Sequence, residues 1–598
     1  MLNAIPANAF ERLMRDAQSR LAAGRPHDAA ALFDQARALH PDSVEALSGL
    51  SLALLHAQRA ADAVRVTEQV VALRPASAGA HANLGLALIA AGQSARAIES
   101  LLTATRLAPQ WAIGFLNLGL AQLQLGRHSE AVLSLRQAAA IDPASTQTRE
   151  NLVLALLGGG LPREAVAAAR QAVADIPASA ALHGGLLLTL HNDPAISAAQ
   201  LFAEHLAWSD RHAAGVPPMP AAQVDRSPER VLRVGYVSAD FRRHSVAEFF
   251  EPLLAAHDRT RVEPFCYSAT PYADAMTARL RHLAGPERWR DITALSDAQA
   301  AVQVRADRID ILVDLAGHTA GNRLLLFAAQ PAPVQATWLG YPDTTGVKAI
   351  AYRLTDHLAD PQGAEAFSTE CLWRIGPPFL CYQPPPDAAP LSELPALRTG
   401  RITFGCFGAA AKINDPLLAL WTDLLHSIPG SRLLLKNSSM TDSPARERVM
   451  RFFSDRGIDA ARLDLRRRSA SYATHFAHYA DIDIALDTFP YHGVTTTCEA
   501  LWMGVPVVTC TGQTHHARVG RSLLESVGLA GLAGESFADY GQIAQRLAGD
   551  VPQLAALRRD LRGRMAASPL LDAPHFAGRI EAAYRGMWSR FIGHHPEP

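Results

Sequence analysis

The stretch from 481 to 504 holds the residues best placed to do chemistry. Its apolar run ends at Asp487 and predicts a buried parallel strand, after which three threonines open a helix: Thr495, Thr496 and Thr497. The first N–H groups of a helix have no partner within it, and the helix dipole adds partial positive charge there. The hydroxyls and N–H groups together predict a site for an anionic phosphate. From this stretch alone, a threonine cap on an ordinary helix is the alternative.

Two further side chains would act beside such a phosphate. Glu499 lies one turn into the same predicted helix, where its carboxylate would accept hydrogen bonds from sugar hydroxyls. Lys412 follows an expected strand at 402–407 and precedes a helix with Pro416 near its start. A lysine at this place would lie over a diphosphate as a point charge, unless it is an ordinary solvated surface lysine.

Two histidines are candidates for contacts with a substrate. His244 comes just after an expected strand at 231–237, where a near-neutral imidazole would orient an acceptor hydroxyl or take its proton. A loop histidine that caps a helix explains the same position. His475 precedes the strand that ends at Asp487 and would contact a base or a sugar, although a half-buried amphipathic helix explains it equally well.

A turn after another expected strand, 334–338, would bring bare backbone close to a ligand. The turn contains Leu339, Gly340 and Tyr341. Glycine has no Cβ, so a ligand can approach the main chain closely at this point.

These candidates lie in two α/β halves that begin near Val231. Short β-rich runs alternate there with helical segments, which is typical of doubly wound parallel sheets. The expected strands are 231–237, 262–268, 309–315, 334–338 and 351–355 in the first half, and 402–407, 431–436, 463–465, 482–487 and 506–510 in the second. Ligands bind at the carboxyl ends of such strands, which places the candidates in a crevice between the halves. A final helix at about 573–592 is expected to pack back over them.

The first third of the chain is a repeat array with a period of 34 residues. A proline, a small residue and a turn glycine each keep this step. The members are Pro41, Pro75, Pro109, Pro143 and Pro177; Ala29, Ala63, Ala97, Ala131 and Ala165; and Gly92, Gly126 and Gly160. This pattern is the signature of tetratricopeptide repeats (TPR), and it predicts five of them from about residue 8 to 177.

Three asparagines occupy one equivalent position in successive repeats: Asn83, Asn117 and Asn151. Stacked repeats curve into a superhelix whose concave wall holds an extended ligand, usually a peptide. An amide both donates and accepts hydrogen bonds, so such a row would grip a peptide backbone whatever its side chains. Local packing is the alternative, and Gly49 interrupts the row in the second repeat.

Composition excludes several kinds of partner. The chain has 56 basic and 57 acidic residues and a net charge of −1, so nothing favours nucleic acid or an anionic membrane. Its six cysteines form no CxxC pair, which favours buried thiols in a reducing compartment, and no apolar segment reaches the length of a membrane span. We therefore expect a cytoplasmic protein.

We also expect no metal site. The residues Asp481-x-Asp483 resemble the metal-binding motif of many sugar transferases. Strand alternation, however, turns one of these carboxylates away from the crevice. No other metal-ligand spacing occurs in the sequence.

Together these residues resemble the O-linked N-acetylglucosamine (O-GlcNAc) transferases of glycosyltransferase family 41, in their bacterial form. The resemblance covers essentially all 598 residues, and its carriers are Arg233 to His244, Pro331 to Gly346, Lys412 to Pro416 and Leu486 to Gly504. It implies an α + α/β chain: an all-α TPR superhelix and a GT-B glycosyltransferase of two doubly wound, Rossmann-like domains. It also implies inverting, metal-independent transfer of N-acetylglucosamine from UDP-GlcNAc to Ser or Thr hydroxyls of polypeptides, without a cofactor.

The resemblance assigns roles to individual residues. Lys412 matches the lysine that binds the diphosphate and stabilises departing UDP, and His244 matches a crevice histidine considered as the base. His475 matches a histidine beside the nucleotide. The other matches are Thr495 and Thr496 at the phosphate-binding helix, Glu499 at the ribose, and Leu339, Gly340 and Tyr341 around the sugar.

The expected domains follow from the repeats, the proline-rich breaks and the resemblance. They are a TPR superhelix at 1–192, a connector at 193–229, catalytic lobes at 230–395 and 396–570, and a C-terminal helix and tail at 571–598. The expected partners are a protein or peptide acceptor on the TPR groove and UDP-GlcNAc. A homodimer is left open.

The chain departs from the family pattern at three positions beside the donor. Val494 replaces a histidine, Ala409 a polar residue, and Gly408 a frequent asparagine. Such losses of polar contacts would lower sugar affinity or shift the donor towards UDP-glucose. Two alternatives therefore stay open: a UDP-glucose-using protein N-glucosyltransferase, and a TPR scaffold with a weakly active transferase domain. The regular repeats favour the O-GlcNAc transferase.

Overall fold

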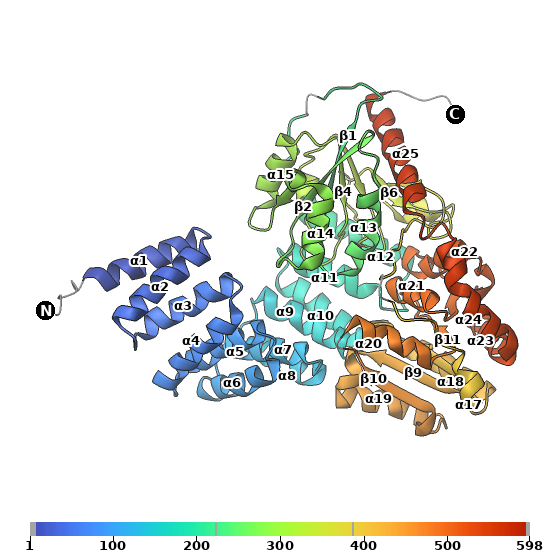
Figure 1. Cartoon of the computed structure of the whole chain (residues 1–598), viewed down its shortest axis with the longest axis horizontal. Coiled ribbons are helices and arrows are strands. Elements are labelled where there is room, and N and C mark those ends of the chain that lie inside the picture. The colour runs from blue at the N-terminus through green and yellow to red at the C-terminus, as the bar shows by residue number, and fades with distance from the viewer. Residues whose placement is uncertain (1–7, 222–223, 386–387, 470, 594–598) are drawn as a thin grey trace. The chain divides into compact units, whose positions relative to one another are not determined.

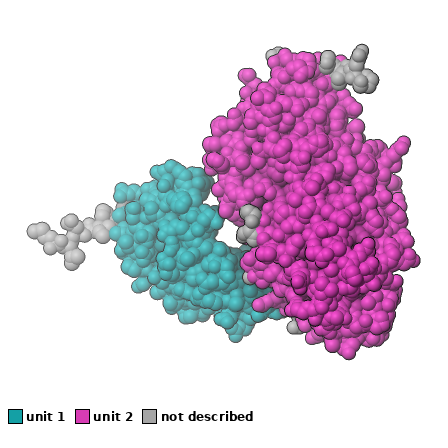
Figure 2. All heavy atoms as spheres, turned by 45° about the vertical axis from the view of Figure 1, so that its right-hand side comes forward, with its two compact units in different colours: residues 1–159 teal, residues 160–598 magenta. Residues whose placement is uncertain are grey.

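A computed structural model describes residues 8–221, 224–385, 388–469 and 471–593. The chain divides into two compact units, residues 1–159 and 160–598, which Figure 2 shows in different colours. Among the described residues, no helix combines the length and the apolar character that crossing a membrane requires. All six cysteines are free thiols, and Cys371 alone among them is exposed.

The first unit consists of the predicted helical repeats (Figure 1). Its helices are α1 (Asn8–Ala22), α2 (Pro26–Leu39), α3 (Val44–His56), α4 (Ala60–Leu73), α5 (Ala78–Ala90), α6 (Ser94–Leu107), α7 (Ala112–Gln124), α8 (His128–Ile141) and α9 (Thr146–Gly158). The repeated alanines of this unit, Ala29, Ala63, Ala97 and Ala131, are completely buried. The predicted period is therefore confirmed as a packing period, because a larger side chain at these places would force neighbouring helices apart.

Capping explains where the first helix of each repeat begins. The proline that ends one repeat is followed two residues later by serine, and Ser43, Ser77 and Ser145 each accept a hydrogen bond from a backbone N–H in the first turn of the next helix. Trp111 stands at this position before α7 and provides no side-chain cap. Trp111 instead packs against the hydrophobic core of the first unit, which holds the start of α7 where the cap is missing.

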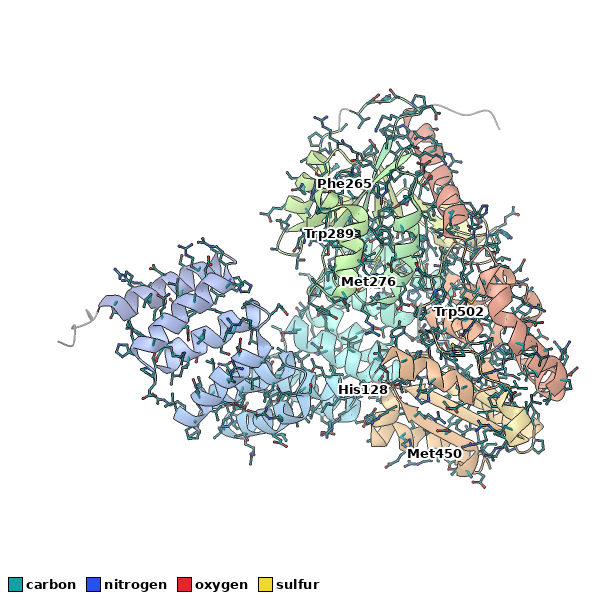
Figure 3. The ribbon with its side chains drawn as sticks, viewed as in Figure 1. His128, Phe265, Met276, Trp289, Met450 and Trp502 are labelled. Carbon is teal, nitrogen blue, oxygen red and sulfur yellow. The ribbon has the colours of Figure 1, made fainter. Side chains whose placement is uncertain are left out.

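Glycines in these repeats make room for neighbouring side chains. A Cβ on Gly158 would lie 2.3 Å from Cε1 of His128, a buried residue labelled in Figure 3. Gly92 and Gly126 have φ angles of 71°, in the left-handed region that glycine adopts without strain. These turn glycines let each helix pair reverse direction.

The second unit begins with helices and then forms two parallel sheets. Its first helices are α10 (Pro162–Asp175), α11 (Ala180–Leu190) and α12 (Ala198–Trp208). The first lobe contains α13 (Ser245–Ala256), α14 (Ala275–Ala284), α15 (Asp297–Ala306) and α16 (Leu324–Ala328), around β1 (Leu232–Ser238), β2 (Val262–Ser268), β3 (Trp289–Asp291), β4 (Ile311–Asp314), β5 (Val334–Thr337), β6 (Tyr352–Thr355) and β7 (Cys371–Arg374). The strand order is β3-β2-β1-β4-β5-β6-β7.

The second lobe has a smaller sheet with the order β10-β9-β8-β11-β12-β13. Its strands are β8 (Thr403–Cys406), β9 (Arg432–Asn437), β10 (Leu463–Arg467), β11 (Ile484–Leu486), β12 (Val507–Cys510) and β13 (Ala533–Gly534). Its helices are α17 (Pro395–Thr399), α18 (Asp415–Ser427), α19 (Ser443–Ser454), α20 (Tyr472–Ala477), α21 (Thr495–Trp502), α22 (Val519–Ser526), α23 (Phe537–Gly549) and α24 (Val551–Ala566).

The two doubly wound sheets confirm the predicted fold class. The sequence did not predict β3, β7 and β13, which are short strands at sheet edges. In edge strands the alternation of buried and exposed side chains is weak, so the hydrophobic pattern gives little signal.

The last helix, α25 (Ala573–Ile592), has the bounds expected from the sequence. It packs against α13 and β5 of the first lobe. Glu581 on this helix accepts a hydrogen bond from His257, with Nδ1 and Oε1 3.0 Å apart, and both side chains are buried. The end of the chain therefore completes the core of the first lobe.

Candidate active site

A cavity of about 390 Å³ lies between the two lobes. The first lobe lines it with His244, Leu339 and Gly340, and the second with Lys412, Thr495 and Thr496. The structure thus brings six residues singled out in the sequence to one place. The three positions that depart from the family pattern, Gly408, Ala409 and Val494, also line it.

Lys412 ends a short 3-10 helix at Ala410–Lys412, directly after β8. Its Nζ donates a hydrogen bond to the carbonyl oxygen of His492 at 2.7 Å and lies 3.8 Å from the centroid of the Tyr491 ring. Burial lowers the pKa of Lys412 to about 8, partly offset by the negative charge of Asp487. A lysine ammonium group is therefore fixed on the cavity wall, and it loses its charge as the pH rises through about 8.

The start of α21 lines the same cavity. The N-cap residue is Val494, whose side chain forms no capping hydrogen bond with the helix. Asp487 instead holds the preceding turn, since its Oδ1 accepts a hydrogen bond from the N–H of Gly493 at 2.7 Å. The helix N–H groups at Thr495 and Thr496 are thus available to an anion, because no side-chain cap competes for them.

Thr497 differs from its two neighbours. Its hydroxyl donates to the carbonyl oxygen of Gly493 at 3.0 Å and is buried, so the side chain braces the turn. Any contribution of Thr497 to an anion would come from its backbone N–H.

His244 is the N-cap of α13, which is the alternative role considered from the sequence. Its Nδ1 accepts the N–H of Val246 at 3.3 Å, while the nearest oxygen of Asp240 lies 3.6 Å away, beyond hydrogen-bond distance. Burial lowers the pKa of His244, partly offset by Asp240. A neutral ring that accepts at Nδ1 carries its proton on Nε2, so the other edge of His244 is a hydrogen-bond donor.

The turn after β5 lines the cavity through Leu339 and Gly340. Leu339 has a φ of 75°, which is strained for a residue with a branched side chain. A Cβ on Gly340 would lie 1.8 Å from the carbonyl oxygen of Leu315, so only glycine fits. The close approach at Gly340 is to the main chain of Leu315, and the predicted approach of this turn to a ligand stays a prediction.

Tyr341 does not share this position. Its side chain is buried, and its hydroxyl lies 2.7 Å from Nε2 of His205 on α12. The ring packs against His191 and His318. Tyr341 therefore packs between α12 and the first lobe, and no local pattern predicts this because its partner His205 is 136 residues away in the chain.

Glu499 and His475 form a cluster on the inner side of the second lobe. Oε2 of Glu499 is 2.8 Å from Nε2 of His475 and accepts the Tyr479 hydroxyl at 3.1 Å. Nδ1 of His475 accepts a hydrogen bond from Lys436. The two predicted residues are thus in direct contact.

Lys436 was not singled out from the sequence. It lies in β9, buried, with Nζ 4.7 Å from the centroid of the Phe407 ring, and burial lowers its pKa to about 8. Its place near the carboxyl end of β9 was the available signal, since ligands bind at that end of a parallel sheet.

A carboxyl group of the first lobe approaches this cluster. The Tyr472 hydroxyl on α20 donates to Glu248 on α13, which joins the two lobes. Burial raises the pKa of Glu248 to about 7.

A second cavity, of about 350 Å³, lies beside the lysine turn. Ala410, Ile413 and Asn414 line it from the second lobe, and residues 160–164 line it from the start of α10. The segment that carries Lys412 is therefore bordered by space on both sides.

The three asparagines of the first unit have different surroundings. Asn83 is exposed. Asn117 is buried, and its Nδ2 has no hydrogen-bond partner among the described residues. Asn151 donates through Nδ2 to the carbonyl oxygen of Gln147 at 2.8 Å. Equal spacing in sequence has thus not produced equal environments.

Comparisons with known proteins agree with this geometry. The sequence model of glycosyl transferase family 41 matches residues 195–376 and 393–580, and a tetratricopeptide repeat model matches residues 15–78 and 82–146. A solved structure of an O-GlcNAc transferase from Thermobaculum terrenum is 37% identical, covers 86% of this chain and 98% of its own, and superposes with a TM-score of 0.79.

Two plant relatives extend the similarity. The probable UDP-N-acetylglucosamine–peptide N-acetylglucosaminyltransferase SPINDLY of Arabidopsis thaliana is 43% identical over 66% of this chain and 43% of its own length. The probable enzyme of the same activity named SEC, also from Arabidopsis thaliana, is 30% identical over 60% of this chain and 37% of its own. The chain thus spans about two fifths of the length of these relatives.

Proposed function

The chain belongs to glycosyl transferase family 41, and we propose that it transfers N-acetylglucosamine from UDP-GlcNAc to Ser or Thr hydroxyls of polypeptides. The observation that carries the proposal is the convergence of Lys412 and the uncapped start of α21 on one interlobe cavity. A cation and free helix N–H groups facing the same space suit a diphosphate. The names of the relatives supply the sugar and the acceptor class.

The reaction breaks the bond between the anomeric carbon and the β-phosphate oxygen. A bond to the acceptor oxygen forms on the opposite face of the sugar, which inverts the anomeric centre. Negative charge grows on the leaving UDP, where Lys412 and the N–H groups at Thr495 and Thr496 stabilise it. These groups stabilise the charge that a metal ion would otherwise stabilise, so the proposed reaction needs no metal ion.

His244 orients the acceptor in this proposal. Because its Nδ1 accepts the Val246 N–H, its Nε2–H donates to the acceptor oxygen and cannot take the hydroxyl proton. The proton passes instead to a phosphate oxygen of the donor or to water.

The Glu499 cluster is proposed to hold the nucleoside. Oε2 of Glu499 is occupied by His475 and Tyr479, and no described residue forms a hydrogen bond to Oε1. That oxygen is available to a ribose hydroxyl. Lys436 fixes His475 from its other side, which keeps the carboxylate in one orientation.

The repeats are proposed to guide the acceptor polypeptide. The exposed amide of Asn83 and the unpartnered Nδ2 of Asn117 are suited to a peptide backbone. Asn151 would have to give up its bond to Gln147 to join them. The free cysteines support a reducing compartment such as the cytoplasm, which cell fractionation would test.

Mass spectrometry of acceptors incubated with the purified chain tests the proposal. Polypeptides containing Ser and Thr, with and without Asn, are offered UDP-GlcNAc, UDP-glucose and other nucleoside diphosphate sugars. Addition of N-acetylhexosamine to Ser or Thr supports the proposal. Addition of hexose to Asn identifies the N-glucosyltransferase alternative, and binding of UDP without transfer from any donor identifies a scaffold.

A further inference from the structure

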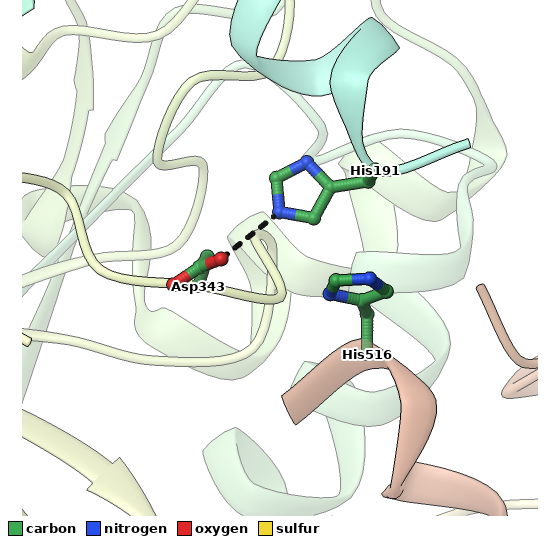
Figure 4. Close-up of side chains that lie close together, drawn as sticks. All are labelled: His191, Asp343 and His516. Carbon is green, nitrogen blue, oxygen red and sulfur yellow. Dashed lines mark hydrogen bonds and ion pairs between the residues drawn. The ribbon is translucent and has the colours of Figure 1, made fainter. Parts of the chain in front are cut away.

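Three side chains distant in sequence lie close together in the second unit (Figure 4). His191 follows α11, Asp343 lies in the loop after β5, and His516 lies in the short 3-10 helix His515–Ala517. One ligand atom from each lies within 4.8 Å of the other two. Both histidines are buried, and the Asp343 side chain is mostly so.

The hydrogen bonds of His191 fix the direction of its lone pair. Nδ1 lies 2.9 Å from the carbonyl oxygen of Leu187, which can only accept, so Nδ1 carries a proton. Nε2 then points at Oδ2 of Asp343, 3.3 Å away. Two acceptors face each other there unless a second proton or a metal ion lies between them.

His516 adds a second buried nitrogen whose lone pair lacks a hydrogen-bond donor among the described residues. It is 4% exposed, and its Nδ1 has no hydrogen-bond partner among the described residues. Nε2 lies 3.2 Å from the Thr514 hydroxyl oxygen, which can accept its proton. In that tautomer the lone pair of Nδ1 is free, and a buried nitrogen without a partner is costly.

We propose that His191, Asp343 and His516 bind one Zn²⁺ ion, with water as the fourth ligand. Zinc binds histidine nitrogen and carboxylate oxygen at about 2.0–2.1 Å, so tetrahedral ligands lie about 3.3 Å apart. The distance from His191 Nε2 to Asp343 Oδ2 is 3.3 Å. The separations from His516 are no more than 4.8 Å, so its side chain closes the remaining gap by a movement of at most about 1.5 Å.

Groups behind the ligands hold them in place. The carbonyl oxygen of Leu187 orients the His191 ring, and the N–H of Thr344 donates to the second oxygen of Asp343 at 2.8 Å. Such partners select the tautomer and the orientation that a metal ion requires.

The ion would join three parts of the second unit. It would tie α11 to the loop after β5 and to the second lobe. Tyr491, whose ring packs against both His191 and His516, also lies under Nζ of Lys412. The site is therefore structural, and it stiffens the wall that carries the lysine without entering the transfer reaction. This proposal departs from the expectation of no metal site, but the proposed transfer reaction itself still uses no metal.

Zinc content of the full-length chain tests this proposal. The chain is purified without an affinity tag, dialysed against metal-free buffer and analysed by elemental mass spectrometry. We expect about one equivalent of Zn²⁺ per chain, and a higher melting temperature with Zn²⁺ than with Ca²⁺ or after chelation. Asp343→Asn and His516→Ala should each weaken zinc binding about tenfold or more.

A surface pair provides the matched control. Nδ1 of His478 lies 3.6 Å from Asp481, away from the cluster, so His478→Ala should leave zinc binding unchanged. If a variant does not fold, the wild-type chain alone tests the site: bound Co²⁺ should give the visible absorption bands of tetrahedral coordination, and Zn²⁺ should abolish them by displacing Co²⁺. A wild-type chain that binds neither ion, or variants that bind zinc as tightly as the wild type, would overturn the proposal.

Discussion

Replacing Lys412 by alanine removes the one side-chain cation that lines the interlobe cavity in the described part of the chain. The hydrogen bond to His492 and the contact with Tyr491 hold Nζ in place before substrate arrives. No reorganisation is then required as charge develops on the leaving group, which is the condition under which such a donor contributes most.

The size of the effect follows from the charge that grows on UDP. Two unit charges 4 Å apart interact by about 4 kcal/mol at an effective dielectric constant near 20. About half of this interaction energy, about 2 kcal/mol, develops between the ground state and the transition state. By comparison, the loss of a preorganised donor in comparable sites costs about 3–4 kcal/mol. The two estimates, about 2 kcal/mol and about 3–4 kcal/mol, together predict that Lys412→Ala lowers kcat by a factor of about 30 to 1000.

Initial rates of UDP release in the presence of acceptor peptide measure this loss. Lys436→Ala is the matched control. Burial lowers the pKa of Lys436 to about 8, as it does for Lys412, but Lys436 contacts His475 in the Glu499 cluster instead. Its loss should raise the donor KM more than it lowers kcat. A Lys412→Ala variant that folds and turns over within threefold of the wild type would refute the assigned role.

Three further outcomes follow from the same site. The value of kcat/KM should fall as pH rises through about 8, because the pKa of Lys412 is lowered to about 8 and the lysine loses its charge above that pH; a profile flat to pH 9.5 would contradict this. Gly340→Ala should destabilise the fold by about 2 kcal/mol or more and abolish transfer, whereas Gly185→Ala, with open space around it, should not lower the melting temperature. His244→Asn, which keeps a helix cap, should lower kcat/KM about tenfold, the loss of one hydrogen bond; a thousandfold fall in kcat would instead identify a general base.

Much of the fold could be predicted because it follows from local periodicity. A step of 34 residues located the repeats, and apolar runs located the central strands. The cavity residues were predictable for a related reason. His244, Leu339, Lys412 and Thr495 all follow strands or open helices, and parallel topology brings such positions together.

What the sequence did not reveal depends on contacts between distant segments. Tyr341 lies in a turn that lines the cavity, but its side chain faces His205, and no local pattern encodes that choice. Lys436 occupied an apolar strand without a neighbouring motif. His191 and Asp343 are 152 residues apart, so no ligand spacing could connect them.

The return of α25 to the first lobe has a consequence for synthesis of the chain. Glu581 and Tyr584 on this helix bond to His257 and Tyr236 inside that lobe. During translation, the first lobe, whose last strand β7 ends at Arg374, therefore lacks this cover until α25 has been made about 200 residues later. A ribosome that stalled before residue 573 would release a first lobe without its cover, and exposed apolar surface of this kind promotes aggregation.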